Sequence, residues 1–153
     1  TGQTTCKNCL TGNVALSKGS ASCSTCSKGA YCPDGTSQIQ CPKGTFNNIS
    51  GQTVKTACKN CSNGFVALST GATACSICNK GAYCQNAKSQ ILCPKGTFNN
   101  ISGLSSCKNC LSGYVALSTG ATARWMMYIH SVNDQLAAGD IAVDPGNASG
   151  YID

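Results

Sequence analysis

The sequence predicts a small disulfide-rich protein: an elongated tandem repeat of short β-hairpins and turns, with little helix. Three observations carry this prediction. The 153 residues include fourteen cysteines, the cysteine spacing repeats along the chain, and only 6% of the residues are aromatic. A chain with so many cysteines and so few large apolar side chains depends on covalent bridges, because its core is too small to hold the fold.

The repeat is a six-cysteine unit, C-x2-C-x13-C-x2-C-x5-C-x8-C. It runs from Cys6 to Cys41 and recurs 52 residues later, and Cys107 and Cys110 open a third copy. This organisation predicts repeat 1 over residues 1–49, repeat 2 over 50–101, a partial repeat 3 over 102–123 and a non-repeat tail over 124–153. Near-identical copies build length or a multivalent surface, whereas a catalytic site needs one special copy.

Within a unit, the local signals are those of strands and turns. Residues 65–69 and 72–75 flank Thr70-Gly71 and predict a hairpin with glycine at the turn, and residues 14–23 and 115–123 repeat that pattern. Pro33-Asp34-Gly35 predicts a further turn. No stretch of residues 1–123 sustains an apolar period of 3.6 residues, so we expect almost no helix there.

Two chemistries compete for the cysteines. The spacing of Cys6, Cys9, Cys23 and Cys26 suits a four-thiolate zinc site, and the second unit repeats it. Disulfides are favoured because six cysteines per unit form an even set, and because the third C-x2-C has no second one after it. A lone C-x2-C could also be a redox motif, but no thioredoxin-like context surrounds it.

Six cysteines allow fifteen pairings, so spacing alone leaves the connectivity open. A sequential scheme is the simplest hypothesis, because every loop that it closes is short. It pairs Cys9–Cys23, Cys26–Cys32, Cys41–Cys58, Cys61–Cys75, Cys78–Cys84 and Cys93–Cys107. Cys6 and Cys110 are then left unpaired or available for bonds between subunits.

Two stretches of the unit carry a family resemblance: Cys26-Ser-Lys-Gly-Ala-Tyr-Cys32-Pro-Asp-Gly-Thr, and Cys41-Pro-Lys-Gly-Thr-Phe. They resemble the ephrin-receptor-like cysteine-rich repeat, a module similar in style to tumour necrosis factor receptor and EGF-like repeats. The resemblance covers residues 1–123. The module that these residues resemble occurs in large extracellular proteins, including protist mastigoneme proteins, and the composition, rich in C-x2-C, Ser, Thr and Asn, is similar to that of ciliate surface immobilisation antigens. The resemblance implies a coat or appendage of a single-celled eukaryote and supplies no catalytic residues.

Three Asn-x-Ser sequences predict N-linked glycans, at Asn48, Asn100 and Asn147. Asn48 and Asn100 occupy the same repeat position, in a polar loop. Asn60-Cys61-Ser62 matches formally, but we discount it because Cys61 is expected in a bridge. We expect no cofactor and no metal.

The charge is uneven. Residues 1–123 hold ten Lys and one Asp, whereas residues 124–153 hold Arg124 and four Asp. The lysines are spread singly and lack an accompanying arginine cluster, which argues against nucleic acid as a partner. No run of 18 apolar residues predicts a membrane span, and no signal peptide precedes the repeats, so secretion is inferred from the cysteines.

The tail begins where the repeat predicts a cysteine. Arg124 stands there, and residues 124–130 are the most apolar stretch of the chain. We expect a short helix or strand within residues 124–138 and a strand at 141–143. The tail would either cap the last repeat or dock against a neighbouring subunit.

Together these observations predict an extracellular structural repeat protein of a surface coat or filament, glycosylated and self-associating. The alternative is the ectodomain of a receptor or adhesin that binds a protein ligand, and the third hypothesis is a zinc-ribbon array. An enzyme is not expected, because the chain holds one His and no Glu.

Overall fold

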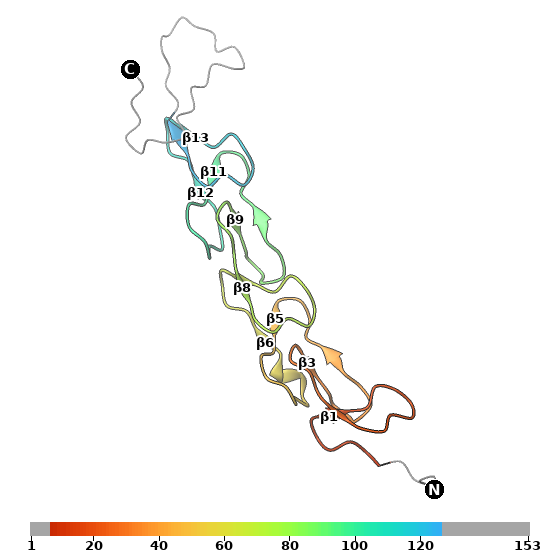
Figure 1. Ribbon diagram of the computed structural model, residues 1–153. Helices are drawn as coiled ribbons and strands as arrows, with labels where there is room; N and C mark the ends of the chain where they lie inside the picture. Colours follow the sequence, from red (N-terminus) through yellow and green to blue (C-terminus); the bar gives the residue numbers. More distant parts are fainter. Residues whose placement is uncertain (1–6, 127–153) are drawn as a thin grey trace, which may run out of the picture.

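The structure, a computed structural model, describes residues 7–126 and has the shape of a long, narrow stack of hairpins (Figure 1). Each described strand is two residues long and pairs antiparallel with its neighbour in sequence, giving seven two-stranded sheets in this part of the chain. The first four hairpins are β1 (Asn13–Val14) with β2 (Ser24–Thr25), β3 (Ala30–Tyr31) with β4 (Ile39–Gln40), β5 (Thr45–Phe46) with β6 (Lys59–Asn60), and β7 (Phe65–Val66) with β8 (Ser76–Ile77). The last three are β9 (Ala82–Tyr83) with β10 (Ile91–Leu92), β11 (Thr97–Phe98) with β12 (Lys108–Asn109), and β13 (Tyr114–Val115) with β14 (Trp125–Met126).

A single short motif, Cys-x-x-Gly-x-apolar, starts all seven hairpins. Its glycines have φ angles between 73° and 83°, a region that L side chains rarely adopt. They are Gly12, Gly29, Gly44, Gly64, Gly81, Gly96 and Gly113. In the first six hairpins the carbonyl of this glycine accepts a hydrogen bond, 2.8–3.0 Å long, from the backbone N–H of the cysteine that ends the hairpin.

Each hairpin is hydrogen-bonded to the next one. The backbone N–H of the third residue after the motif glycine donates to a carbonyl in the following hairpin's loop, as from Ala15 to Gly35 at 2.8 Å and from Asn47 to Ala72 at 3.0 Å. Six such bonds, of 2.8–3.0 Å, join the seven hairpins without a break. The stack is therefore one-dimensional, with each unit held mainly by its neighbours.

Four of the hairpins also contact the next but one through glycines. Their motif glycine lies against a loop glycine two hairpins further on: a Cβ on Gly12 would lie 2.7 Å from the Gly51 carbonyl oxygen, and a Cβ on Gly29 would collide with that of Gly71. The loop glycine also donates its N–H to a cysteine carbonyl, as from Gly51 to Cys26 at 2.8 Å. These approaches are possible only between residues without side chains.

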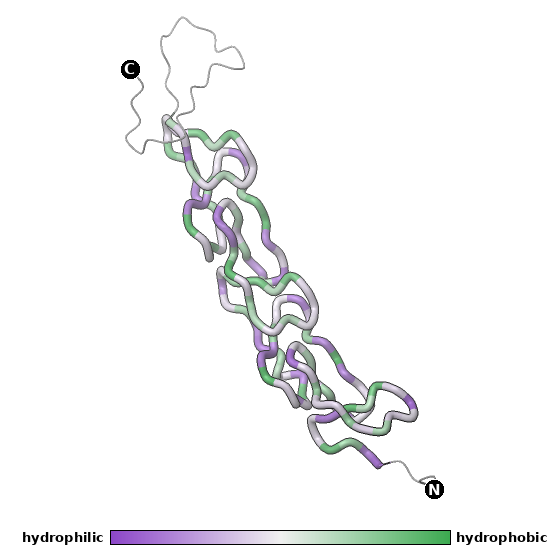
Figure 2. Tube along the Cα trace, in the orientation of Figure 1, coloured by the Kyte–Doolittle hydropathy of each residue, from purple (hydrophilic) through white to green (hydrophobic). Residues whose placement is uncertain are grey.

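The core is thin. The two clusters of buried apolar side chains each contain one Val, one Ala and two cysteines; they are Val14, Cys26, Ala30 and Cys32, and Val66, Cys78, Ala82 and Cys84. Hydrophobic and hydrophilic residues alternate along the whole length of the stack (Figure 2). Disulfide sulfur thus fills much of the space that large aliphatic side chains fill in an ordinary domain.

The fold class is the predicted one, but the hairpins are more numerous than expected. The pattern in the sequence indicates one hairpin per unit, whereas the structure has three in each 52-residue repeat. In the hairpin expected over residues 65–75, the second strand lies beyond Cys75, at Ser76–Ile77. The helical content is as low as predicted: among residues 7–126 only Lys55–Ala57 form a 3-10 turn.

The expected boundaries of the repeats lie inside hairpins. The boundary after residue 49 falls in the loop between β5 and β6, and the boundary after residue 101 falls in the loop between β11 and β12. In the tail, residues 124–126 belong to the last hairpin. The helix or strand expected over the rest of 124–138, and the strand at 141–143, lie outside the described residues.

Candidate functional site

The cysteines form six disulfides in the described residues, with Cα–Cα distances of 5.4–6.0 Å. The pairs are those of the sequential scheme: Cys9–Cys23, Cys26–Cys32, Cys41–Cys58, Cys61–Cys75, Cys78–Cys84 and Cys93–Cys107. The cysteines whose spacing suits zinc in repeat 2 are all bridged, so they offer no thiolate ligand. No group of three or more metal-ligating side chains occurs among residues 7–126.

The C-x2-C motif has a structural meaning that spacing alone does not show. Its first cysteine closes the loop of one hairpin, and its second opens the next. Cys58 is bridged back to Cys41, while Cys61 is bridged forward to Cys75. Cys61 also donates its N–H to Gly44 at 2.9 Å, which ends the earlier hairpin. One short motif therefore joins two neighbouring hairpins.

Cys110 is a free thiol, half-buried, at the start of the last described hairpin. Its counterparts Cys9 and Cys61 are each bridged to the cysteine fourteen residues later. For Cys110 that position holds Arg124. The guanidinium of Arg124 lies over the rings of Tyr114 and Phe98, 4.5 Å and 5.6 Å from their centroids. At the position where the equivalent hairpins have a disulfide, Arg124 thus makes one cation–π contact within its own hairpin, to Tyr114, and one to the preceding hairpin, to Phe98.

The state of Cys6, the other cysteine left over by the sequential scheme, lies outside the described residues, as does that of Asn147.

The two described glycan acceptors are accessible. Asn48 and Asn100 are exposed, and the Asn100 amide oxygen accepts a 3.4 Å hydrogen bond from Lys108 Nζ. Asn60 is exposed too, but the next residue, Cys61, is bridged. The geometry leaves room for a glycan at the predicted positions, and glycosylation itself stays a prediction.

The asparagine preceding each acceptor has a different role. Asn47 and Asn99 are 3% and 0% exposed. Asn47 Nδ2 donates to the Ala30 carbonyl at 2.7 Å, and Asn99 Nδ2 donates to that of Ala82 at 2.8 Å. Each side chain therefore ties its hairpin back to the preceding one. This role was not predicted from the sequence, although the segment Gly-Thr-Phe-Asn, which is repeated unchanged at 44–47 and 96–99, was a signal that could have indicated it.

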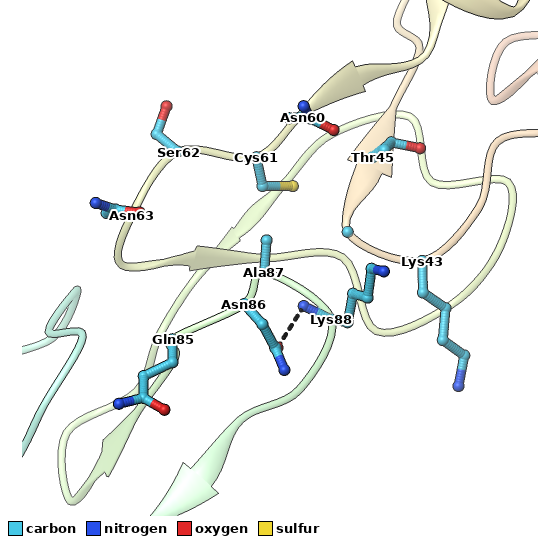
Figure 3. Close-up of a pocket in the computed structure, with 11 residues that line it drawn as sticks. Lys43, Thr45, Asn60, Cys61, Ser62, Asn63, Gln85, Asn86, Ala87 and Lys88 are labelled. Carbon is cyan, nitrogen blue, oxygen red and sulfur yellow. Dashed lines mark hydrogen bonds between the residues drawn. The ribbon is translucent and has the colours of Figure 1, made fainter.

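A small pocket of about 190 Å³ opens between the third, fourth and fifth hairpins (Figure 3). Two lysines, Lys43 and Lys88, line it together with several amide side chains; the amides are Asn60, Asn63, Gln85 and Asn86. The remaining lining residues are Gly44, Thr45, Cys61, Ser62 and Ala87. Neither the lysines nor the pocket were singled out from the sequence, because the residues that meet there come from three separate hairpins.

The loop that carries Lys88 is fixed. Asn86 Oδ1 accepts hydrogen bonds from the backbone N–H groups of Lys88 and Ser89, at 3.0 and 3.2 Å. Ala87 has a φ of 58° without being glycine, and its carbonyl accepts the N–H of Ala67 at 2.9 Å. A non-glycine residue in this region is uncommon and is held there by its surroundings.

The described residues carry almost no acidic charge. They contain all eleven Lys and Arg side chains of the chain but only one carboxylate, that of Asp34. That carboxylate accepts hydrogen bonds from the backbone N–H and hydroxyl of Thr36, both at 2.8 Å, and from Ser37. These hydrogen bonds lower the pKa of the Asp34 carboxyl below its usual value, and the one from the backbone N–H of Thr36 has the largest effect. Asp34 is therefore occupied within its own turn.

Exposed aliphatic side chains recur at matching positions of successive repeats. They include Leu16, Leu68 and Leu117, Ile39 and Ile91, and Ile49 and Ile101, with 41–64% of each side chain's surface exposed. Repetition of an exposed apolar position is not explained by packing within the stack. Along the described part of the chain, no helix is long and apolar enough to cross a membrane.

Comparison with protein-family models finds no match for this chain, and comparison with curated proteins finds none either.

Proposed function

We propose that the chain is an extracellular structural repeat protein that serves as a stiff spacer in a surface coat or filament. The single observation that carries the proposal is the continuity of the stack. A backbone hydrogen bond crosses each of the six junctions between described hairpins, and four of these junctions carry a C-x2-C motif, as at Cys58 and Cys61. Glycine pairs such as Gly12 and Gly51 also connect a hairpin with the next but one. Such a chain of local contacts resists bending without a large core.

The choice of compartment rests on the disulfides. Twelve bridged cysteines in a chain of this size are typical of secreted and cell-surface proteins, because the cytosol keeps thiols reduced. N-linked glycans at exposed Asn48 and Asn100 would then cover the stack at one position per repeat. The resemblance to ephrin-receptor-like repeats, and to mastigoneme proteins and ciliate surface antigens, supports the same role.

Self-association is the second part of the proposal. The aliphatic side chains that recur on the surface give one stack a periodic set of contacts for another copy. Cys110, a free thiol in the last described hairpin, and Cys6 are the residues through which copies would be linked covalently.

Small-angle X-ray scattering and negative-stain images of the oxidised, glycosylated chain test the proposal. The expected result is an extended particle that forms ordered fibres or sheets at high concentration. A compact particle would contradict the spacer role, and an extended but strictly monomeric one would contradict self-association. Thiol titration in denaturant separates bridges from zinc: twelve or more free thiols with bound zinc would favour the zinc-ribbon array.

The alternative, a receptor or adhesin ectodomain that binds a protein ligand, is favoured by one observation, the exposed aliphatic side chains that recur along the stack, which a partner protein could cover as well as a second copy. It predicts saturable binding to a partner protein in solution, independent of assembly.

A further inference from the structure

The pocket between the third, fourth and fifth hairpins has a lining that neither the repeat nor the spacer role explains. It brings Lys43 and Lys88 together, although these residues are far apart in the sequence and no carboxylate lies among its lining residues. Figure 3 shows both lysines on one side of the opening, with Asn63 and Gln85 on the other; the Lys88 side chain lies beside Ala87, and the Lys43 side chain extends outward. A cavity that gathers cations without a counterion favours an anionic ligand.

The placement of Lys88 depends on Gly44. A Cβ on Gly44 would lie 2.8 Å from Lys88 Cγ, so the lysine stem crosses the space that any other residue would fill. The strained backbone at Ala87, fixed by Asn86 and Ala67, directs the stem there. The stem of Lys88 therefore lies at the pocket, and its amino group is exposed to solvent, where an incoming anion can reach it.

The rest of the stack adds to this positive field. Among residues 7–126 none of the lysines has an ion-pair partner, and the one carboxylate, on Asp34, is hydrogen-bonded within its own turn. Lysines also recur at equivalent positions immediately before the motif glycine, namely Lys28, Lys43, Lys80 and Lys95. A long anion that enters the pocket would therefore meet further cations along the stack.

We propose that this pocket binds one acidic sugar residue of a sulfated or carboxylated polysaccharide, with Lys43 and Lys88 as the cationic contacts and Asn60, Asn63 and Gln85 as hydrogen-bonding amides. The amides offer both donors and acceptors, which suit sugar hydroxyls. The small volume suits a single sugar ring better than a peptide. Nucleic acid is disfavoured, because no aromatic side chain lines this pocket to stack on a base.

The choice of a glycan as the anion rests on the proposed extracellular role. The two proposals fail separately, because an extended particle seen by scattering does not depend on any ligand. The pocket also uses a loop two hairpins further along the stack, so it requires three consecutive hairpins.

The test measures binding of the full, oxidised chain to dextran sulfate and to polygalacturonate, with unsulfated dextran of matched length as the neutral control. We expect both acidic polymers, or one of them, to bind in 50 mM salt and to weaken as salt rises, and dextran not to bind. Which acidic polymer binds more tightly distinguishes sulfate from carboxylate. The proposal would be overturned if neither acidic polymer bound, or if dextran or oligo-dT bound as tightly as the acidic polymers.

A matched pair of variants separates the pocket from general charge. K43Q/K88Q and K18Q/K55Q each remove two exposed lysine charges, but Lys18 and Lys55 lie outside the pocket. We expect the pocket pair to raise Kd at least about tenfold, as for lost charge-assisted hydrogen bonds, and the control pair to raise it about threefold at most. Equal effects of the two pairs would refute a specific site. Intact mass under non-reducing conditions verifies that both variants keep the six disulfides.

Discussion

Substituting Gly29 by alanine tests whether contacts between alternate hairpins hold the stack together. Gly29 has a φ of 78°, and a Cβ there would collide with the Gly71 carbonyl oxygen, two hairpins further on. Its backbone has little freedom to move away. The N–H donates to Asn47 at 2.7 Å, and the carbonyl accepts from Cys41 at 2.8 Å. Relieving the collision therefore requires breaking one of these bonds or separating the hairpins.

Gly19 is the matched control. Its φ is 77°, but nothing lies within 4 Å of a Cβ placed on it. Both substitutions carry the same cost of about 1 kcal/mol for placing alanine in the left-handed region. Gly29→Ala adds a steric cost of about 2 kcal/mol, in the range for inserting a methyl group into packed surroundings. The expected total losses are thus about 3 and about 1 kcal/mol.

Amide hydrogen exchange measures this difference locally, which suits a stack that need not unfold in one step. The informative amides are those of Gly71 and Asn47, which donate across neighbouring hairpins to Cys41 and Ala72. About 2 kcal/mol corresponds to exchange about thirtyfold faster in G29A than in G19A. Equal exchange in the two variants would refute the reasoning. Gly81→Ala and Gly96→Ala form a second pair: the first Cβ would meet Gly120, and the second would meet nothing within 4 Å.

Three further predictions concern the last hairpin, the buried asparagine and the disulfides. In Arg124→Cys, the new cysteine should form a disulfide with Cys110, since equivalent cysteines fourteen residues apart are bridged in earlier hairpins, and this bridge should stabilise the last hairpin by about 3 kcal/mol. A free Cys110 thiol in R124C, detected by alkylation and mass spectrometry, would contradict this. In the unglycosylated chain, Asn47→Ala should lower the free energy of unfolding, measured with denaturant, by about 1–3 kcal/mol, because it leaves buried groups unpaired. The control Asn48→Ala, at an exposed position, should change it by no more than about 0.5 kcal/mol, and equal effects would show that the buried side chain does not hold the hairpins together. Complete reduction should unfold the stack, because two small clusters of Val, Ala and cysteine cannot hold it without the bridges. An unchanged X-ray scattering profile after reduction would contradict that account.

The hairpins illustrate how far local sequence signals reach. Glycine, β-branched residues and turn dipeptides predict hairpins near residues 14, 65 and 115, and hairpins occur there. The four others were not recognised, because two-residue strands such as Ala30–Tyr31 are too short to show any alternation. The motif Cys-x-x-Gly-x-apolar marks all seven, but its meaning depends on knowing that the glycine carbonyl meets a later cysteine N–H.

The cysteine pattern by itself determined the class of fold and the repeated unit. It left the pairing open, and the simplest hypothesis, the sequential one, agrees with the bridges in the structure. Cysteine count and spacing carry this information because a disulfide joins residues whose separation along the chain is visible in the sequence. Only the tertiary structure decided which residues of different hairpins contact one another. The collision at Gly29, the burial of Asn47 beside exposed Asn48, and the pocket of Lys43 and Lys88 all arise from residues brought together by stacking. Those contacts depend on the rotation and spacing of successive hairpins, which no local pattern of residues encodes.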